Sequence, residues 1–222
     1  MKKLLILICI IFLSPLFAAA EQINVAFTID NNFPMFTMLL MESILDNNDS
    51  NSDYKFWVVE NNVSDKNKKK MENYIKSRNQ QIEFIHFDTE AIDKGTNFFT
   101  FSAGAITPIA MARIMLPDLM PKDIHRVLYL DSDMLATGDI SEMYNTDLGK
   151  YTVGMVKNTS QDETKIYKFK DGYFNSGLIL MDLDKCRKEN SPKKMVDFLT
   201  KHKKMRKTDI RFFALFSPAT AD

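Results

Sequence analysis

The sequence predicts an α/β fold in which helices cover both faces of a mostly parallel central sheet. Segments typical of strands alternate with amphipathic helical segments through the first half of the chain, an order that favours a parallel sheet. A short apolar run at residues 127–130 ends in two acids, Asp131 and Asp133, and ligands of open α/β sheets bind where the strands end. With 45% hydrophobic and 26% charged residues in 222, the composition is that of one globular domain.

The first half of the chain supplies three strands and two helices. Residues 23–29 alternate and are rich in β-branched and aromatic side chains, which favours a strand. A helix is expected over residues 34–45, because proline is tolerated in the first turn, and its apolar surface comprises Met35, Met38, Leu39, Met41, Ile44 and Leu45. The next expected elements are a strand at 54–60, a helix capped by Ser64 or Asp65 that runs through Arg78, and a strand at 81–87.

The second half is expected to continue the sheet. Residues 107–116 look helical, residues 117–123 form a break, and residues 127–130 are too short a run for a helix and are predicted as a buried strand. The remaining expected elements are a short helix around 140–144, strands at 151–156 and 174–182, and a last helix from 191 to about 203.

Asp131 and Asp133 are the candidate metal ligands. Two carboxylates spaced i and i+2 at a strand end can both approach one hard cation. Mg²⁺ or Mn²⁺ typically keeps one or two protein carboxylates and takes water and substrate phosphates in its other positions. The pattern therefore predicts a site for a phosphate compound held by a metal.

The acidic pair has three other interpretations, of which the EF-hand fails on its own sequence pattern. An isolated Asp-Ser-Asp is commonly a solvated turn. An EF-hand would use Asp131 and Asp133 as its first and third ligands, but Ala136 replaces the required glycine and a strand precedes the loop. An aspartyl-phosphate phosphatase also ends a strand in Asp-x-Asp, with the first aspartate as nucleophile.

Two further segments carry candidate binding residues. Arg113 is a lone cation in an apolar helical segment; it either snorkels or caps, or its planar fork of donors binds phosphate or steadies an aspartate. Asn175 and Gly177 precede a strand, where they would let a ligand approach the backbone or would simply start the strand.

Charge and the first residues bear on partners and location. Lys plus Arg and Asp plus Glu both number 29, so no global field draws the chain to nucleic acid.

Residues 1–20 have the order of a secretory signal, with Lys2 and Lys3, an apolar run and three alanines, although an uncleaved membrane anchor remains the alternative. We expect export or anchoring, to the periplasm or envelope in a bacterium or to the ER and Golgi lumen in a eukaryote, with possible membrane association.

Four ordered motifs resemble those of glycosyltransferase family 8. They are residues 25–33, 111–114, 128–140 and 172–178, so the resemblance covers roughly residues 23–200. The family implies a GT-A type, Rossmann-like fold that binds a nucleotide sugar. It also implies a retaining hexosyltransferase that moves glucose or galactose from a UDP-sugar to a saccharide or glycolipid acceptor, as in lipopolysaccharide biosynthesis, using Mn²⁺ or Mg²⁺.

The resemblance also implies roles for individual residues. Asp131 and Asp133 would hold the metal on the diphosphate. Asn175 and Asp209 would be the catalytic residues, and the remaining donor-binding set would be Thr28, Asp30, Asn32, Phe33, Arg113, Ser132 and Gly177.

The family pattern is altered near the C-terminus. Of its Asp-Gln-Asp segment only Asp209 is matched, and its later His-x-x-Gly-x-x-Lys-Pro-Trp segment has no counterpart. We therefore expect one domain over residues 21–222 whose last part, from about 205, is missing or altered. The alternative function is a catalytically inactive relic that still binds a sugar nucleotide or saccharide, and the phosphatase is third.

Overall fold

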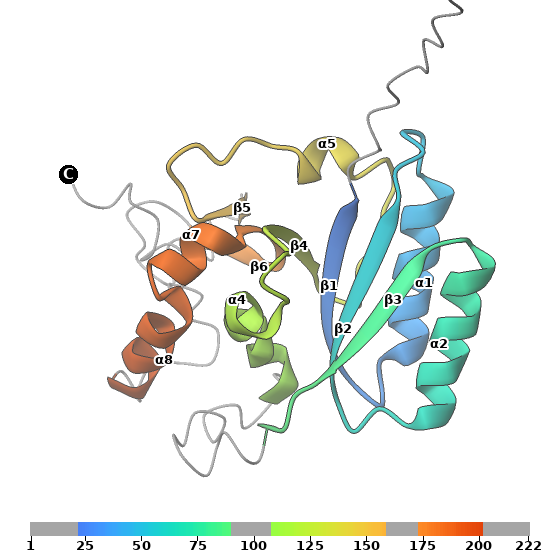
Figure 1. Ribbon diagram of the computed structural model, residues 1–222, viewed down its shortest axis with the longest axis horizontal. Helices are drawn as coiled ribbons and strands as arrows, with labels where there is room; N and C mark the ends of the chain where they lie inside the picture. The colour runs from blue at the N-terminus through green and yellow to red at the C-terminus, as the bar shows by residue number, and fades with distance from the viewer. Residues whose placement is uncertain (1–21, 90–107, 159–172, 202–222) are drawn as a thin grey trace, which may run out of the picture.

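The computed structural model describes residues 22–89, 108–158 and 173–201. Within these ranges the centre of the molecule is a six-stranded sheet in the order β3-β2-β1-β4-β6-β5 (Figure 1). Its strands are β1 (Ile23–Asp30), β2 (Tyr54–Asn61), β3 (Gln81–His86), β4 (Arg126–Leu130), β5 (Val153–Asn158) and β6 (Tyr173–Asp182). All described pairings are parallel except those of β6, which is antiparallel to β4 and β5. The predicted α/β fold with a mostly parallel sheet is confirmed.

Helices cover both faces of this sheet (Figure 1). Helices α1 (Pro34–Asp46) and α2 (Asp65–Ser77) pack on one face, against alternate strand residues that include Val25, Phe27 and Leu128. The 3₁₀ helix η2 (Pro108–Met115) packs on the other face with α4 (Leu116–Leu119), α7 (Leu183–Lys188) and α8 (Ser191–Lys201). The intervening residues, such as Ala26 and Tyr129, point to that second layer, because successive strand side chains face opposite ways.

The topology brings three chain segments to one edge of the sheet. Strands β1 and β4 end there, and β6, which runs the other way, begins there. Leu130 pairs with Leu178, and the backbone N–H of Asp131 then donates to the carbonyl of Gly177 at 2.7 Å. We call this end of the sheet the carboxyl edge and the opposite end the amino edge.

The connection between η2 and β4 differs from the prediction. Most of the segment predicted as an ordinary helix is a 3₁₀ helix, and α4, which begins at Leu116, continues into the residues where a break was expected. Pro117 does not interrupt this helix because it lies in the first turn, where no intrahelical N–H is required. Helix α7 was not predicted; the side chain of Asp182 caps it by accepting a hydrogen bond from the backbone N–H of Lys185.

Helix α1 packs Met38, Met41, Ile44 and Leu45 against the core as predicted, but two of its predicted apolar-surface residues face solvent. Met35 and Leu39, assigned to the apolar surface, are 66% and 56% exposed, whereas Leu40, Met41 and Ile44 are buried. Thr37 is also buried, because its hydroxyl donates to the carbonyl of Phe33 at 2.9 Å. Since apolar residues surround this helix, their spacing could not fix which side faces inward.

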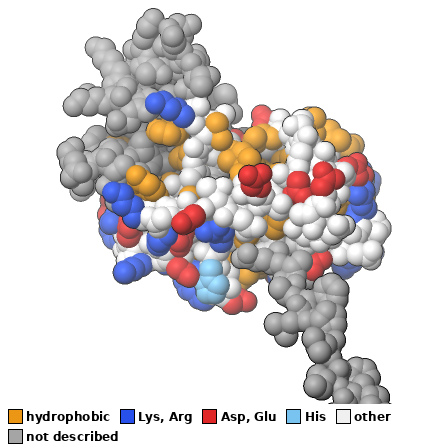
Figure 2. Space-filling model, turned by 90° about the horizontal axis from the view of Figure 1, so that it is seen from above, with side chains coloured by type: hydrophobic (Ala, Val, Ile, Leu, Met, Phe, Trp, Pro, Cys, Tyr) orange, Lys and Arg blue, Asp and Glu red, His pale blue; other side chains and the backbone are white. Residues whose placement is uncertain are grey.

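The surface drawn in Figure 2 carries intermingled acidic and basic side chains. Interspersed charges of both signs cancel within a Debye length, so this face presents no broad field of one sign. Among the described residues, no helix is both long and apolar enough to cross a lipid bilayer.

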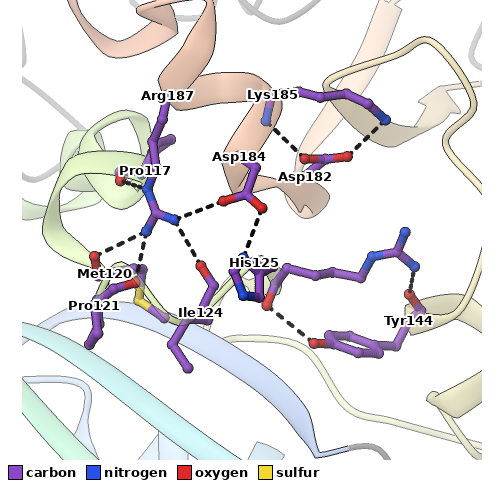
Figure 3. Close-up of polar contacts among 11 residues, drawn as sticks. Pro117, Met120, Pro121, Ile124, His125, Tyr144, Asp182, Asp184, Lys185 and Arg187 are labelled. Atoms are coloured by element: carbon purple, nitrogen blue, oxygen red, sulfur yellow. Dashed lines mark hydrogen bonds and ion pairs between the residues drawn. The ribbon is translucent and has the colours of Figure 1, made fainter.

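A polar network closes the amino edge (Figure 3). The guanidinium of Arg187, on α7, donates to four main-chain carbonyls in the segment before β4, those of Pro117, Met120, Pro121 and Ile124. It also pairs with Asp184 at 3.3 Å, and Asp184 contacts His125 at 2.8 Å. Because the carbonyls of a loop need donors when they are covered, Arg187 fixes the path of the chain into β4.

Candidate functional site

Asp131 lies at the centre of a cluster on the carboxyl edge. It follows β4 directly, and its side chain is 33% exposed. The two oxygens of its carboxylate have different surroundings. Oδ1 is contacted by Tyr129 at 2.5 Å and by Arg113 at 3.0 Å, whereas Oδ2 faces Gly177.

Arg113 steadies this aspartate from the last turn of η2. Its Nε donates to the carbonyl of Ala110 at 2.6 Å, and Nη1 donates to the carbonyl of Ser176 at 2.8 Å. The guanidinium carbon lies 4.8 Å from the centre of the Tyr129 ring, within the range of a cation–π contact. Of the roles predicted for Arg113, the described contacts match the steadying of an aspartate.

Tyr129 is the residue that sequence reasoning missed. It is 1% exposed, and burial raises the pKa of its hydroxyl well above the ordinary value, so the group stays protonated. An ionised carboxylate only accepts hydrogen bonds, so Tyr129 donates to Asp131. The i and i+2 spacing of the two residues, which places both on one face of a strand, was the signal available in the sequence.

Gly177 and Asn175 form the other side of the cluster. A Cβ added to Gly177 would lie 2.9 Å from Oδ2 of Asp131 and 3.0 Å from Oδ1 of Asn175. The Asn175 amide oxygen accepts from the backbone N–H of Gly177 at 2.7 Å, which turns the start of β6 toward the aspartate. Glycine is therefore the residue that fits here, because any side chain would press on the Asp131 carboxylate.

Ser132 and Asp133, the other two residues of the Asp-Ser-Asp motif, have different surroundings from those of Asp131. Asp133 is exposed, and within the described ranges it makes no hydrogen bond or ion pair. Ser132 is buried, and its hydroxyl is 3.0 Å from that of Thr37 on α1. Ser132 therefore joins the loop to α1, and its described contact does not face the cluster around Asp131.

The end of β1 contributes the remaining described candidates. The Thr28 hydroxyl lies 3.0 Å from that of Tyr129, which joins β1 to the Asp131 cluster. Asp30 accepts from the backbone N–H of Asn32 at 2.8 Å, and the Phe33 ring lies 6.0 Å from that of Phe36. Asn32 is exposed, and it and Phe33 lie in the turn that follows β1, the strand next to β4; we call Asp30, Asn32 and Phe33 the rim.

The structure thus joins Thr28, Arg113, Asp131, Asn175 and Gly177, and places Asp30, Asn32 and Phe33 beside them. Asp209, the second predicted catalytic residue, lies outside the described residues. The EF-hand alternative does not fit, because both oxygens of Asp139, its ninth position, accept backbone N–H groups from Ser50 and Ser141.

The donor set around Asp131 fits Mg²⁺ or Mn²⁺. Oδ2 of Asp131 borders the space that a Cβ on Gly177 would fill, and Asp133 supplies a second carboxylate two residues on. These cations characteristically use one or two protein carboxylates and leave further positions to water and phosphate. Among the described residues no group of three or more His, Cys, Asp or Glu gathers as a metal site, so these residues contribute at most the two carboxylates of Asp131 and Asp133.

Comparison with known protein families helps to choose between the activities predicted for the Asp131 motif. The model of glycosyl transferase family 8 matches residues 24–217. The chain belongs to glycosyl transferase family 8. Membership in this family favours glycosyl transfer over the phosphatase alternative for the Asp131 motif.

Relatives within and around this family support the assignment. General stress protein A of Bacillus subtilis is 30% identical over 186 residues, which cover 82% of this chain and 63% of that protein. Glycosyltransferase GlyF of Streptococcus pneumoniae is 27% identical over 141 residues, covering 63% of this chain and 32% of that protein. The chain spans about three fifths of the length of the first of these relatives.

A solved structure of the galactosyltransferase LgtC, in complex with donor and acceptor sugar analogues, shares the fold. Its TM-score is 0.75 at 23% sequence identity, over 88% of this chain and 71% of that one. The family 8 chain therefore has the GT-A type fold, with its described candidate residues at the carboxyl edge of the sheet.

Proposed function

We propose that this family 8 chain is a retaining hexosyltransferase that moves glucose or galactose from a UDP-sugar to a saccharide or glycolipid acceptor. The observation that carries the proposal is the Asp131 carboxylate, which is 33% exposed and has one oxygen held by Tyr129 and Arg113, while the other lies beside Gly177 with no partner among the described residues. In open α/β sheets, nucleotides bind beyond the carboxyl ends of the strands, which is where this carboxylate lies.

Asp131 and Asp133 would hold Mn²⁺ or Mg²⁺ against the diphosphate. Bound there, the cation supplies positive charge to a leaving UDP, so no strong general acid is needed. The rim of Asp30, Asn32 and Phe33 would bind the uridine, because a carboxylate and an amide match its hydroxyl and imide groups and an aromatic ring stacks on a base.

The start of β6 would contact the donor sugar. The oxygen of the Asn175 amide is used by Gly177, so the amide nitrogen is the group that Asn175 can offer to a ligand. Arg113 keeps Asp131 in place, and we propose that Asp209 contributes to catalysis from the following segment.

A turnover assay tests this proposal. The full chain is incubated with UDP-glucose or UDP-galactose and Mn²⁺, with and without a saccharide acceptor, and released UDP is measured. We expect UDP release that EDTA and Asp131→Asn abolish, and a product whose anomeric configuration, determined by NMR, equals that of the donor. A folded protein that releases no UDP from either donor, or a product of inverted configuration, would contradict it.

A second candidate is a binding protein without turnover. It is favoured by one observation, namely that the described residues offer only two carboxylates at the site, since fewer charged ligands lower the affinity for the metal. UDP binding that needs Mn²⁺, together with no UDP release from any UDP-hexose, would establish this alternative.

We further propose that residues 1–20 direct export or membrane anchoring. Mass spectrometry of the protein from its host would then show either cleavage near Ala20 or the uncleaved chain in the membrane fraction. Recovery of the full-length chain in the cytosolic fraction alone would contradict this.

A further inference from the structure

We propose that Tyr129 is a positioning residue that, with Arg113, reserves a single oxygen of Asp131 for the divalent cation. The inference rests on the proposed function. It assigns a role to a buried tyrosine within the motif at residues 128–140, for which the sequence predicted none.

The first step is the occupation of Oδ1. Tyr129 donates a hydrogen bond to this atom at 2.5 Å, and the guanidinium of Arg113 forms an ion pair with it at 3.0 Å. Since a carboxylate oxygen offers about two lone-pair positions, the hydrogen bond and the ion pair together engage Oδ1. Oδ2 lies close to Gly177, where a Cβ would come within 2.9 Å of it, and among the described residues it has no hydrogen-bond or ion-pair partner, so it is the oxygen left for a cation.

The second step is the direction of the hydrogen bonds. Because Tyr129 gives its proton to Asp131, its oxygen is left as an acceptor for the Thr28 hydroxyl at 3.0 Å. The chain of donors therefore runs from Thr28 on β1, through Tyr129 on β4, to the carboxylate. Thr28, expected from the family resemblance to lie by the nucleotide, acts in this arrangement through Tyr129.

The third step concerns the choice of cation. A carboxylate with one oxygen available binds a metal through that oxygen alone. Mg²⁺ demands near-octahedral geometry with few protein ligands, whereas Ca²⁺ takes six to eight oxygens and commonly uses both atoms of a carboxylate. The Tyr129 and Arg113 contacts therefore favour small octahedral cations, Mg²⁺ and Mn²⁺, over Ca²⁺.

Tyr129→Phe in the full chain is the test. Mn²⁺ binding in the presence of UDP is followed by the EPR signal of free Mn²⁺, and Ca²⁺ is added as competitor. We expect Mn²⁺ affinity to fall roughly tenfold, as for partners that orient metal ligands. Because Ca²⁺ tolerates a freely turning carboxylate, the preference for Mn²⁺ over Ca²⁺ should also fall, by roughly threefold or more.

The chain offers a matched control in Tyr54. This tyrosine is equally buried, at 1% exposure, and within the described residues its hydroxyl has no hydrogen-bond partner. Tyr54→Phe should change neither the Mn²⁺ affinity nor the preference over Ca²⁺. A loss caused by general weakening of the core would appear in both variants, whereas the proposed role predicts a loss only at Tyr129.

A folded Tyr129→Phe protein whose Mn²⁺ affinity and cation preference both stay within about twofold of the wild type would overturn the inference. If that variant does not fold, Thr28→Val takes its place, because it keeps the shape and removes the donor to Tyr129; a decrease of roughly twofold or more supports the inference and none overturns it. A folded wild type that binds no Mn²⁺ with UDP fails the proposed function and this inference together, whereas normal wild-type binding with unchanged variants fails the inference alone.

Discussion

Each of the two edges of the sheet holds a largely covered arginine, and the partners of the two arginines differ. At the amino edge, Arg187 gives its donors to four backbone carbonyls and to Asp184 (Figure 3). At the carboxyl edge, Arg113 gives its donors to two carbonyls and to Asp131. The side chains are similarly covered, at 13% and 12% exposure, so burial alone does not distinguish them.

The two edges differ in whether a polar group near the arginine remains without a partner. Around Arg187 the donors end on main-chain oxygens and on Asp184, whose other oxygen is contacted by His125. Arg113 also contacts one oxygen of a carboxylate, but among the described residues the second oxygen of Asp131 has no hydrogen-bond or ion-pair partner, and the neighbouring Asp133 is exposed. Polar groups that are fully satisfied build structure, whereas a partly satisfied charge at a ligand-binding edge indicates function. Substitutions at the two edges should therefore separate binding from stability.

The largest expected effect is the loss of metal binding in Asp131→Asn. This change removes the charge from the oxygen that faces Gly177, so Mn²⁺ affinity in the presence of UDP should fall by about 1,000-fold or more. Equilibrium dialysis with Mn²⁺ measures the change. Asp184→Asn, at the amino edge, is the control and should bind Mn²⁺ as the wild type does. Equal losses in both variants would remove the distinction between the edges.

Arg187→Ala should have the converse effect. Removing the guanidinium leaves several covered carbonyls without donors, so the free energy of unfolding should fall by about 3 kcal/mol, with binding of UDP and Mn²⁺ retained below the melting temperature. Urea denaturation measures the fall. Lys193→Ala breaks an exposed pair with Asp197 and should cost less than about 0.5 kcal/mol. An Arg187→Ala protein as stable as Lys193→Ala would show that the amino-edge network is not structural.

Gly177→Ala sharpens the account of the carboxyl edge. The new Cβ would lie 2.9 Å from Oδ2 of an aspartate whose other oxygen is held by two donors, so the carboxylate cannot turn away freely. Mn²⁺ affinity should fall about tenfold with little change in melting temperature. Gly138→Ala is matched to it, because a Cβ there meets nothing within 4 Å, and it should be neutral in the same titration. Equal affinities of the two variants would refute the close approach.

The smallest expected effect on stability is that of Asp139. Both oxygens of its carboxylate accept hydrogen bonds from backbone N–H groups. Burial opposes its ionisation, but the N–H groups of Ser141 and Ser50 lower its pKa to about 2. A lowered pKa stabilises the fold above the unfolded value near 3.8, and this contribution is lost as the pH falls from about 4 to about 2. After allowance for solvent screening it amounts to roughly 1 kcal/mol. Urea midpoints of wild type and Asp139→Asn should converge over that interval, and a constant difference would contradict the shift.

The sequence was sufficient for the strands and for the place of the acidic pair at a strand end. Runs of apolar, β-branched and aromatic residues indicated β1 and β2, which the sheet buries on both faces, and Asp131 directly follows β4. These features depend on local pattern, since a short apolar run and a polar strand end are visible in one stretch of residues.

Contacts between residues that are distant in the sequence could not be predicted from local patterns. Tyr129 is an ordinary strand residue until Thr28 and Arg113, from other elements, come beside it. The buried side of α1 was assigned wrongly at Met35 and Leu39 because only packing of the whole helix selects among many apolar residues. The sequence did not reveal helix α7 because the helix follows β6 without a loop. Its capping residue, Asp182, is also the last residue of β6, and an aspartate there is typical of a strand end as well.

The most direct test of the central claim is a calorimetric titration of the full chain with UDP, with and without Mn²⁺. The account predicts UDP binding that requires Mn²⁺ and disappears in Asp131→Asn, whereas Arg187→Ala, measured below its melting temperature, still binds. UDP binding of equal strength without any divalent cation, or none from a folded sample, would contradict the assignment of the carboxyl edge as a nucleotide-sugar site.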